Sequence, residues 1–333
     1  MKALVTGGGG FLGRYIVELL LERGDEVSIF CRGSYPDIAK MGVNVIRGDL
    51  RDPDAVNSAC KDQEIVFHVA SKIDMWGKRK DFEEINIKGT QNVVDACLNN
   101  NVSKLVYTST ASVVFKEGDL EGVDESEPYA EKFLAHYPKT KVIAEKIVLE
   151  ANGNNGLITT ALRPHLIWGP RDPSLCPRLI KQAKKGRLPV VGKGQNVLDV
   201  TYVANVADAH ILAADSPNSA GQAYFISQGK PVNIWEFINE LTVRIGIKPI
   251  KRKLSFKTAY IGGVLLEFFF KLFHQYKRQP LVTKFLASEL AHSHYFDISK
   301  AKKELGYEPK ISLEEGLDIY IDWLRKDDPD IFK

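Results

Sequence analysis

A tyrosine and a lysine stand four residues apart, at Tyr137 and Lys141. If a helix begins at this point, both side chains lie on one of its faces. Reduction of a ketone needs a proton for the incipient alkoxide, and free tyrosine, with a pKa of about 10, donates one slowly. An ammonium group beside the phenol stabilises the phenolate and lowers that pKa. The pair therefore predicts an acid group that serves hydride transfer to a ketone.

Hydroxyl side chains gather in residues 108–112, which read TSTAS. This run ends an apolar, strand-like segment, so a hydroxyl there is placed to hold a substrate carbonyl against Tyr137. Asn86, in the preceding helical segment, is predicted to fix a water or a backbone group behind Lys141. Each residue alone has a structural explanation, because such hydroxyls often cap turns and a helical asparagine is often structural. Together with the Tyr–Lys pair they predict a reductase site.

Four consecutive glycines follow the first apolar run of the chain and precede a helical pattern. A strand, a glycine loop and a helix in this order form the first unit of a dinucleotide-binding fold. Gly7 is predicted to make the tight turn, Gly10 the close approach to a pyrophosphate, and Gly13 the packing of helix on strand. The phosphates then lie against the N–H groups at the helix start, where Phe11 and Leu12 stand. A mobile glycine-rich turn is the alternative.

The residues that follow the second expected strand bear on the choice of cofactor. An acid at the tip of that strand binds the ribose 2′-hydroxyl of NAD, whereas an arginine accommodates the 2′-phosphate of NADP. Here the strand is followed by Arg32 and Ser34, with no acid at its tip. Arg32, helped by Ser34 and by Arg14, therefore predicts NADP(H) rather than NAD(H). The alternative is that Arg32 is a solvated surface charge.

Strand and helix patterns alternate through the first half of the chain. Strands are expected at residues 3–6, 26–31, 43–47, 64–68, 104–108 and 157–162, and longer helices at 81–99 and 135–151. This alternation predicts an α/β fold with a Rossmann-type, doubly wound parallel sheet and ligands at the carboxyl ends of its strands.

The alternation becomes irregular after Arg163-Pro164, where four prolines fall close together. Residues 1–163 are therefore predicted as the cofactor-binding domain, with segments of about 197–227 returning to it. The strand-like runs 199–203 and 223–227 are expected to rejoin the main sheet. Residues 164–196 and 228–333 are predicted as a smaller, mainly helical, substrate-binding lobe.

Composition excludes several classes of function. Of 333 residues, 44% are apolar and 26% charged, as in ordinary soluble proteins, and the net charge of +3 does not indicate nucleic-acid binding. The four cysteines are widely scattered, without CxxC or a histidine pair at metal-ligand spacing, so we expect free thiols in the cytoplasm and no metal. The strand at the very start leaves no place for a signal peptide.

Residues 258–273 form the most apolar stretch of the chain and admit three interpretations. The stretch carries Glu267 and Lys271 and is too short to span a bilayer. On a helix these two residues, His274 or Gln275, and Arg278 fall on one polar face, and the rest is apolar. The stretch is interpreted as a buried domain helix, as a lid over a hydrophobic substrate pocket, or as a helix that contacts a membrane surface. The last two interpretations are compatible.

These motifs resemble the extended short-chain dehydrogenases/reductases along essentially the whole chain. TGGGGFLG fits the TGxxGxxG of that superfamily, and Tyr137 with Lys141 fits its YxxxK. The resemblance implies that Thr110 is the catalytic hydroxyl, with Ser109 as a fallback, and that Asn86 is the supporting asparagine. It further implies a cofactor site whose other members are Asp49 and Leu50 at the adenine, Ala70 and Ser109 on neighbouring loops, and Pro164 near the nicotinamide.

Within the superfamily the chain resembles the 3β-hydroxysteroid dehydrogenase branch, through ALRPHLIWGPRDP and DVTYVANVADAHILAA. Runs such as GQAYFIS and SFKTAY are more similar still to bacterial 2-alkyl-3-oxoalkanoate reductases of long-chain olefin biosynthesis. The resemblance implies NADP(H)-dependent reduction of a 2-alkyl-3-oxo acid. Sterol-4α-carboxylate or 3β-hydroxysteroid dehydrogenation and a non-catalytic dinucleotide sensor are the alternatives; sugar epimerases are disfavoured by the apolar C-terminal lobe.

A substrate of this kind has a carboxylate and long alkyl arms, so it needs a cation and an apolar tunnel. Arg171 is the first candidate for the cation and Lys72 the second. Trp76, Trp168 and the aromatic segment 260–273 are candidates for the tunnel. The family resemblance also implies a homodimer formed through helices 81–99 and 135–151. Pathway enzymes that hand over the lipid-like substrate are further candidate partners.

Overall fold

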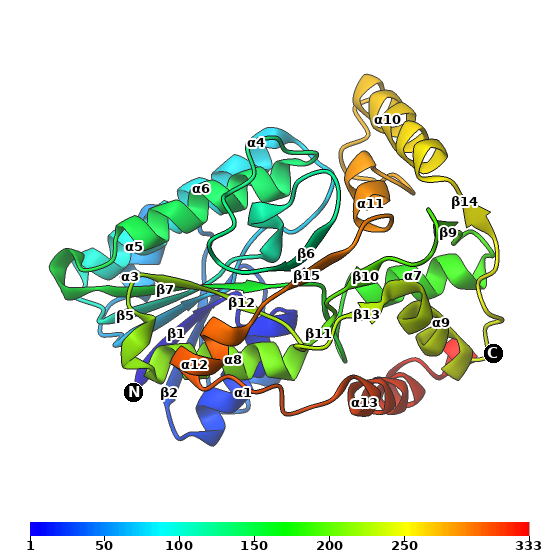
Figure 1. Cartoon of the computed structure of the whole chain (residues 1–333). Coiled ribbons are helices and arrows are strands. Elements are labelled where there is room, and N and C mark those ends of the chain that lie inside the picture. Colours follow the sequence, from blue (N-terminus) through cyan, green and yellow to red (C-terminus); the bar gives the residue numbers. More distant parts are fainter. Residues whose placement is uncertain (333) are drawn as a thin grey trace.

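A seven-stranded parallel sheet forms the centre of the molecule, a computed structural model that describes residues 1–332 (Figure 1). Its strands are β1 (Lys2–Thr6), β2 (Glu26–Cys31), β3 (Asn44–Arg47), β4 (Ile65–His68), β5 (Lys104–Thr108), β7 (Ile158–Pro164) and β12 (Gln222–Ile226). They lie in the order β12-β7-β5-β4-β1-β2-β3. The order reverses between β1 and β4, and ligands of such sheets bind outside the carboxyl ends at that point.

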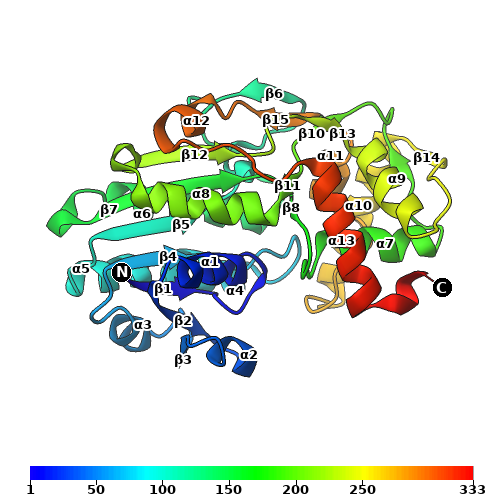
Figure 2. The same cartoon turned by 90° about the horizontal axis from the view of Figure 1, so that it is seen from below.

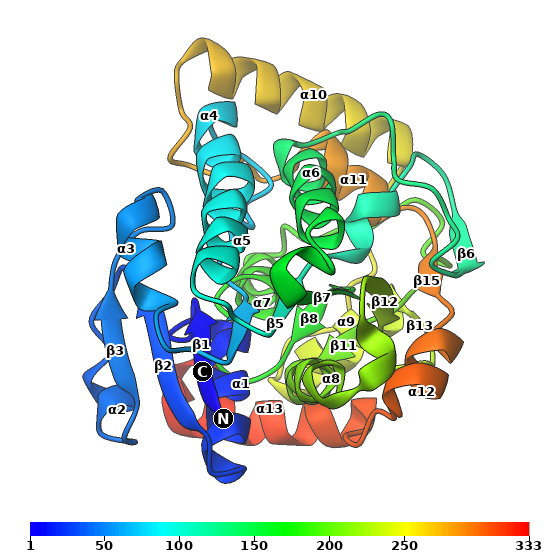
Figure 3. The ribbon, with the colours of Figure 1, turned by 90° about the vertical axis from the view of Figure 1, so that its left-hand side faces the viewer.

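Helices cover both faces of the sheet, as Figure 3 shows. One face carries α1 (Phe11–Glu22) and α8 (Val203–Asp215); the other carries α3 (Pro53–Ala59), α5 (Gly89–Asn99) and α6 (His136–Glu150). Each layer buries its own apolar cluster against the strands. These layers confirm the predicted doubly wound α/β fold. The two helices implied as a dimer contact, α5 and α6, pack side by side on one face, and their pairing with a second copy stays a prediction.

The smaller lobe lies beside the sheet (Figure 2). It has a hydrophobic core of its own. Trp168, Trp235 and Tyr320 are among the large side chains buried there. Its helices are α7 (Leu175–Lys184), α9 (Ile234–Arg244), α10 (Phe256–Leu272), α11 (Lys284–Glu289) and α13 (Leu313–Asp327). Two further short helices are α2 (Pro36–Ala39) and α12 (Ser299–Leu305), and the strands outside the main sheet are β6 (Leu120–Val123), β8 (Ile167–Trp168), β9 (Val190–Val191), β10 (Val197–Leu198), β11 (Thr201–Tyr202), β13 (Val232–Asn233), β14 (Lys253–Leu254) and β15 (His294–Phe296).

One of the two strands expected to return to the main sheet does so. β12 pairs with β7 along its whole length and forms the edge of the sheet. The prediction for residues 199–203 was wrong, because β11 pairs with β8 in a separate two-stranded sheet. The chain turns away from the main sheet after Pro164, with a positive φ of 39° at Leu166. β8 therefore leaves the direction of β7, and β11 follows it.

The helix expected over residues 81–99 is interrupted by a wider turn. It begins as α4 (Arg79–Phe82), continues as a π-helical turn over Glu83–Lys88 and becomes α5 at Gly89. π-helical turns inside α-helices are rare and frequent at functional sites. Asn86, one of the predicted site residues, lies in the middle of this turn.

The apolar segment forms α10, and its orientation bears on the three interpretations left open by the sequence. Its buried residues are Ala259, Gly263 and Glu267, so the face that carries the glutamate points inward. The interpretation as a buried helix was wrong, because most of the apolar side chains are exposed. The predicted polar stripe also fails beyond Leu272, where the helix ends. Within residues 1–332, no helix combines the length and apolarity needed to cross a bilayer.

Candidate active site

The glycine loop joins β1 to α1 at the point where the sheet reverses. Gly7 has a φ of +71°, and its N–H donates to the Phe30 carbonyl at 2.9 Å. A Cβ on Gly7 would lie 3.0 Å from the backbone of Ala70, on the loop after β4. A Cβ on Gly13 would lie 2.2 Å from the Gly7 oxygen. The positive φ of Gly7 suits the tight turn predicted there, and both glycines let backbone pass close to backbone.

The start of α1 fits the pyrophosphate of a dinucleotide. Gly10 stands at the N-cap position and has no side chain to cap the helix, and the first turn holds no acid. Phe11 and Leu12 begin the helix, so their N–H groups point toward an approaching anion, at the positive end of the helix dipole. A Cβ on Gly10 would lie 3.1 Å from the Gly7 oxygen, which keeps the loop compact.

The predicted 2′-phosphate site lies on an open surface. Arg32 and Ser34 follow β2, and both are exposed. The third candidate, Arg14, is already held by two acids: its Nε donates to Glu18 at 3.2 Å, and its Nη1 forms an ion pair with Asp37. Arg32 is thus better placed than Arg14 to meet a phosphate.

The residues implied at the adenine follow β3. Arg51 donates to the Asp49 carboxylate at 2.7 Å, and this contact lowers the pKa of Asp49 to about 2, with a smaller contribution from the charge of Arg32. Leu50 is buried, and its carbonyl accepts from the Asn92 amide at 2.7 Å. Arg32 and Asp49 therefore lie on the same side of the β1–β4 reversal, close enough for their charges to interact.

A buried histidine fixes the loop after β4. The two ring nitrogens of His68 lie 2.8 Å from the Thr6 hydroxyl and 3.0 Å from the Thr90 hydroxyl. Burial lowers the pKa of His68 to about 3, so the ring is neutral at physiological pH. Thr6 also accepts from the Ala70 N–H at 3.2 Å, and Thr90 donates to the Asn86 carbonyl at 2.7 Å. The network ties the ends of β1 and β4 to the π-helical turn.

Tyr137 and Thr110 meet at the carboxyl end of β5. Tyr137 lies in the first turn of α6 and is 8% exposed. Burial raises its pKa to about 12, while a hydrogen bond with Thr110 acts in the opposite direction. The expectation of a lowered tyrosine pKa was therefore wrong for this structure, because desolvation of the phenolate outweighs the neighbouring groups. The Thr110 hydroxyl also accepts from the Ser112 N–H at 3.2 Å, which fixes its position.

Lys141 is buried one turn after Tyr137. Its Nζ donates to the Thr108 carbonyl at 2.6 Å and lies 4.1 Å from the centre of the Tyr107 ring. Burial lowers its pKa to about 7, although the negative charge of Glu145 raises it. The ammonium is thus held at the end of β5, on the side of α6 that carries the phenol.

Asn86 joins the loop after β4 to α6. Its Oδ1 accepts from the Lys72 N–H at 2.7 Å, and its Nδ2 donates to the Lys72 carbonyl and the Thr140 hydroxyl, both at 3.0 Å. Asn86 was predicted to fix a water or a backbone group behind Lys141, and in the structure it binds the backbone of Lys72. Thr140 is the neighbour of Lys141, so the asparagine positions the helix that carries the pair.

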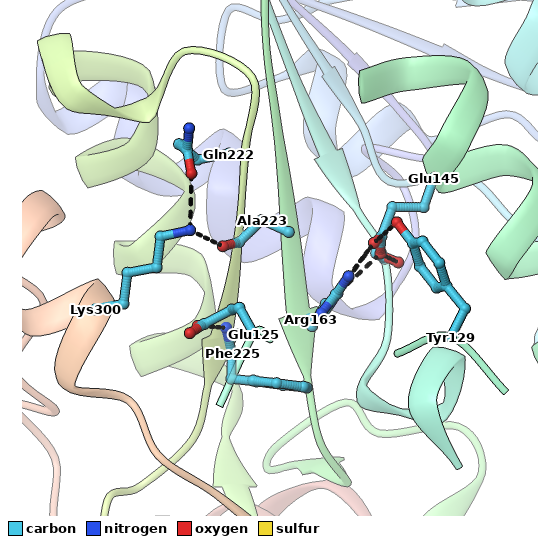
Figure 4. Close-up of polar contacts among 9 residues, drawn as sticks. Glu125, Tyr129, Glu145, Arg163, Gln222, Ala223, Phe225 and Lys300 are labelled. Atoms are coloured by element: carbon cyan, nitrogen blue, oxygen red, sulfur yellow. Dashed lines mark hydrogen bonds and ion pairs between the residues drawn. The ribbon is translucent and has the colours of Figure 1, made fainter. Parts of the chain in front are cut away.

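A buried ion pair behind the catalytic residues escaped the sequence analysis (Figure 4). Arg163 donates to Glu145 through Nη2 at 2.6 Å and Nε at 3.0 Å, and both side chains are almost fully buried. The Tyr129 hydroxyl donates to the same carboxylate at 2.8 Å, and the Ser109 hydroxyl donates to its other oxygen. Glu145 continues the four-residue spacing of Tyr137 and Lys141, which was a usable signal.

The two candidate hydroxyls at the end of β5 have different partners. The Ser109 hydroxyl is committed to Glu145, whereas the Thr110 hydroxyl faces Tyr137. Thr110 therefore stays the first candidate for the catalytic hydroxyl, and Ser109 stays the fallback. Pro164 ends β7, next to β5 in the sheet, and so lies at the same edge.

Two of the predicted substrate residues lie elsewhere. Arg171 donates to both carboxylate oxygens of Glu18, at 2.7 and 3.0 Å, and stacks over Tyr15 with its Cζ 4.4 Å from the ring centre. Arg171 follows β8 and binds residues of α1, so it has a structural role and its assignment to the substrate is corrected. Trp168 is fully buried in the core of the smaller lobe, against Tyr202 and Phe237. It cannot line a substrate tunnel.

The other two predicted substrate residues lie near the site. Lys72 follows the loop held by Asn86, and its Nζ donates to Asp74 at 2.6 Å. Trp76 donates to the Gln275 carbonyl at 3.1 Å and has the Phe270 ring centre at 6.1 Å. Of the aromatic segment proposed for the tunnel, Phe268 and Phe269 are exposed instead.

The smaller lobe also contributes an acid that sequence reasoning missed. Glu289 ends α11, and its charge raises the pKa of Tyr137. Burial raises the pKa of Glu289 itself to about 8, so its carboxyl is mainly neutral at pH 7. Nothing in the sequence around residue 289 distinguishes it from a surface glutamate. It reaches the site only because α11 packs there.

Comparison with known sequences identifies the family. The 3-beta hydroxysteroid dehydrogenase/isomerase family matches residues 4–257. This chain belongs to that family. Members of the 3-beta hydroxysteroid dehydrogenase/isomerase family are short-chain dehydrogenases/reductases, and the chain is accordingly an NAD(P)-dependent oxidoreductase. The geometry above gives the family motifs their places: the glycine loop at β1 and the Tyr137–Lys141 pair on α6.

Three curated relatives illustrate the similarity. A 2-alkyl-3-oxoalkanoate reductase of Stenotrophomonas maltophilia is 45% identical, over 95% of this chain and 97% of that protein. One of Shewanella oneidensis is 43% identical, over 95% and 84%. A decarboxylating sterol-4-alpha-carboxylate 3-dehydrogenase of Mus musculus is 35% identical, over 98% and 92%.

Solved structures share the whole architecture. MoeE5 in complex with UDP-glucose and NAD is 25% identical, with a TM-score of 0.77 over 98% of this chain and 99% of that one. The structure of gox2253 is 27% identical, with a TM-score of 0.79 over 98% of both chains. The dinucleotide-binding fold and its C-terminal lobe are therefore common to all three.

We expect kcat/KM for ketone reduction to fall as pH rises through about 7, because the buried ammonium of Lys141 is protonated below its pKa of about 7 and loses its charge above it. A pH profile of the purified enzyme in the direction of reduction measures this. Lys141→Arg keeps a cation whose pKa is about 12 or higher, so any activity it retains should lack the fall. A wild-type profile that stays flat from about pH 6 to 9 contradicts the prediction.

Proposed function

We propose that the protein reduces a 2-alkyl-3-oxo acid to the 2-alkyl-3-hydroxy acid, with NADP(H) as its cofactor. The observation that carries the proposal is the 45% and 43% identity to two 2-alkyl-3-oxoalkanoate reductases along 95% of the chain. The intact site of Thr110, Tyr137 and Lys141 supports catalysis over the alternative of a dinucleotide sensor, which has no use for these residues.

Reduction adds a hydride to the ketone carbon and a proton to its oxygen; the nicotinamide, when bound, supplies the hydride. Tyr137 supplies the proton: with a pKa of about 12 the phenol stays protonated at neutral pH, which is the state that reduction requires. Thr110 is placed to donate a hydrogen bond to the same ketone oxygen. Lys141 holds positive charge one helical turn away and stabilises the negative charge that develops on the phenol oxygen as its proton leaves.

A 3-oxo acid loses CO2 readily, so its carboxylate needs a binding partner that keeps it in place until the ketone is reduced. Lys72 is the remaining candidate of the two predicted cations. Asn86 holds its backbone beside α6, and its ion pair with Asp74 is partly exposed, with side-chain exposures of 20% and 40%. Such pairs contribute about 0–1 kcal/mol, so a substrate carboxylate can replace Asp74.

Dehydrogenation of a sterol 4α-carboxylate is the second candidate, on the 35% identity to the mouse enzyme. An oxidation assay separates the two: the purified protein receives a long-chain 2-alkyl-3-hydroxy acid or a 4α-carboxysterol, with NADP⁺ or NAD⁺, and formation of reduced nicotinamide is followed. Turnover of the hydroxy acid supports the proposal. Turnover of the sterol alone favours the second candidate function. Binding of NADP(H) without turnover of either substrate rejects both candidate functions.

The preference for NADP(H) is expected to depend on Arg32. Hydrogen bonds to charged groups contribute about 1.5–3 kcal/mol, so Arg32→Asp should lower kcat/KM for NADP⁺ by about ten- to a hundredfold while that for NAD⁺ holds or rises. The ratio of the two kcat/KM values is the measurement. Arg325→Asp, at an exposed arginine of α13, is the matched control and should leave the ratio unchanged. An unchanged ratio in Arg32→Asp contradicts the assignment.

A further inference from the structure

The exposed side of α10 is a continuous apolar surface, here called the α10 apolar face. Its members follow helical spacing, and each is between 43% and 59% exposed. They are Ile261, Val264, Leu265, Phe268, Phe269 and Leu272. The rings of Phe268 and Phe269 contact each other edge to face, with centres 5.7 Å apart. Apolar side chains gathered in this way on a surface mark a site of interaction.

The orientation of α10 is fixed by its opposite side. Glu267 accepts a hydrogen bond from the Lys284 N–H, at the start of α11, with a distance of 2.9 Å. A Cβ on Gly263 would lie 2.6 Å from the same backbone nitrogen, so only glycine lets the two helices approach this closely. Rotation of α10 to bury its phenylalanines would break both contacts. The exposure of the apolar face is therefore a property of the fold.

Positive charge surrounds this helix. Residues 248–284 contain nine lysines and arginines and one acid, Glu267, which gives a formal charge of +8, compared with +3 for the whole chain. The acid is buried, whereas eight of the nine basic residues are exposed. The exposed ones are Lys248, Lys251, Arg252, Lys253, Lys257, Lys271, Lys277 and Arg278. The rest of the chain carries a net charge of −5, so the positive charge is concentrated around α10.

Both ends of α10 are attached to loops of the active site. The Tyr260 hydroxyl donates to Glu117, in the loop that follows the Thr110 turn, at 3.1 Å. At the other end the Phe270 ring packs against Trp76, in the loop after β4. Figure 3 shows α10 lying across the ends of α4 and α6. The helix is thus tied to the active-site loops at both ends, while its outer surface is exposed.

We propose that the α10 apolar face lies in the headgroup region of an anionic lipid surface, with the helix axis parallel to the membrane. Interfacial helices combine an apolar face with flanking lysine and arginine, whereas protein–protein interfaces are depleted in lysine. The seventeen residues of α10 extend about 25 Å, enough to lie along a bilayer but not to span it. The inference does not depend on the substrate, and it places the loops that α10 contacts beside the phase in which long-chain substrates dissolve.

Binding of the full-length protein to vesicles tests the proposal. We expect flotation with phosphatidylcholine vesicles that contain phosphatidylglycerol, and much less with phosphatidylcholine alone. The double variant Phe268→Ser, Phe269→Ser should bind the anionic vesicles at least about tenfold more weakly. Met41→Ser and Ile319→Ser remove exposed apolar side chains from other elements, of 39% and 38% exposure, and should bind as wild type does. Lys257→Gln and Lys277→Gln should each cost about fivefold, and Lys61→Gln nothing.

A local probe separates insertion from general adsorption. All four native cysteines are buried, so Leu265→Cys provides one exposed thiol for a polarity-sensitive fluorophore. Its emission should shift to the blue with anionic vesicles, and that of a label at Met41→Cys should not. Absence of wild-type binding, equal binding by the phenylalanine double variant, or an unshifted Leu265 label overturns the proposal. A change of oligomeric state in the phenylalanine double variant without lipid also overturns the proposal, because it would assign the face to a second copy of the chain. Turnover of a short soluble substrate tests the proposed function separately.

Discussion

Tyr137→Phe should lower kcat by about 10²–10⁴-fold, because general acid catalysis contributes a factor of this size. The substitution removes one oxygen from a ring that is otherwise buried at the first turn of α6, so the fold and the cofactor site should remain intact. KM for the substrate should change little, since the proton moves only in the transition state. Steady-state kinetics measure both constants, and fluorescence titration with NADPH confirms that the cofactor still binds.

Tyr129→Phe is the matched control for this loss. It removes the same atom from another tyrosine, which is half-buried and whose hydroxyl donates to Glu145 at 2.8 Å. Tyr129 lies outside the proton path, so its variant should keep kcat within a few-fold of wild type and lose about 1 kcal/mol of stability. Retention of more than about a tenth of wild-type kcat by Tyr137→Phe would remove Tyr137 from the role of acid.

The two candidate hydroxyls are separated in the same assay. Thr110→Ser preserves the hydroxyl and should keep activity, whereas Thr110→Val should lose it in parallel with Tyr137→Phe. Ser109→Ala should leave kcat nearly unchanged, because the Ser109 hydroxyl is bound to Glu145. The reverse pattern would show that the fallback is the catalytic group.

The sequence predicted the parts of this site that depend on local pattern. The apolar runs locate the strands, the glycines between β1 and α1 locate the phosphate loop, and the spacing of Tyr137 and Lys141 places both on one helix face. Each of these features is determined by neighbours a few residues away. The reversal of strand order then brings the loop and the helix to the same edge of the sheet.

Long charged side chains could not be assigned in this way. Arg171 was expected at the substrate, but it forms an ion pair with Glu18, which lies 153 residues earlier in the sequence. Neither partner carries a local signal of the other, because their contact depends on how β8 leaves the sheet. The prediction of a lowered tyrosine pKa was wrong for a related reason. The spacing of the pair suggests an effect of charge, whereas the burial that raises the pKa of Tyr137 has no local signal in the sequence.

The orientation of α10 shows the same limit. Its apolar and polar faces are readable from the sequence, and the usual rule turns the apolar face inward. Here one backbone N–H, that of Lys284, binds Glu267 and turns the helix the other way. A single hydrogen bond to a residue seventeen positions later is invisible to periodicity.

Glu145→Gln should destabilise the protein by about 3–5 kcal/mol, the usual cost of removing one member of a buried ion pair. The substitution leaves the Arg163 guanidinium, 4% exposed, without a counter-charge, and its Nη1 already has no hydrogen-bond partner among the described residues. Tyr129 and Ser109 would also lose the acceptor that their hydroxyls share. The free energy of unfolding in urea measures the effect.

Glu83→Gln is the matched control, because it breaks the exposed pair with Arg79, whose side chains are 37% and 65% accessible. Such a pair contributes about 0–1 kcal/mol, so the control should unfold nearly as wild type does. In the double variant Glu145→Leu, Arg163→Met both charges are absent, and most of the lost stability should return. A loss below about 1 kcal/mol in Glu145→Gln would contradict the prediction, because the pair would then contribute no more than an exposed ion pair does.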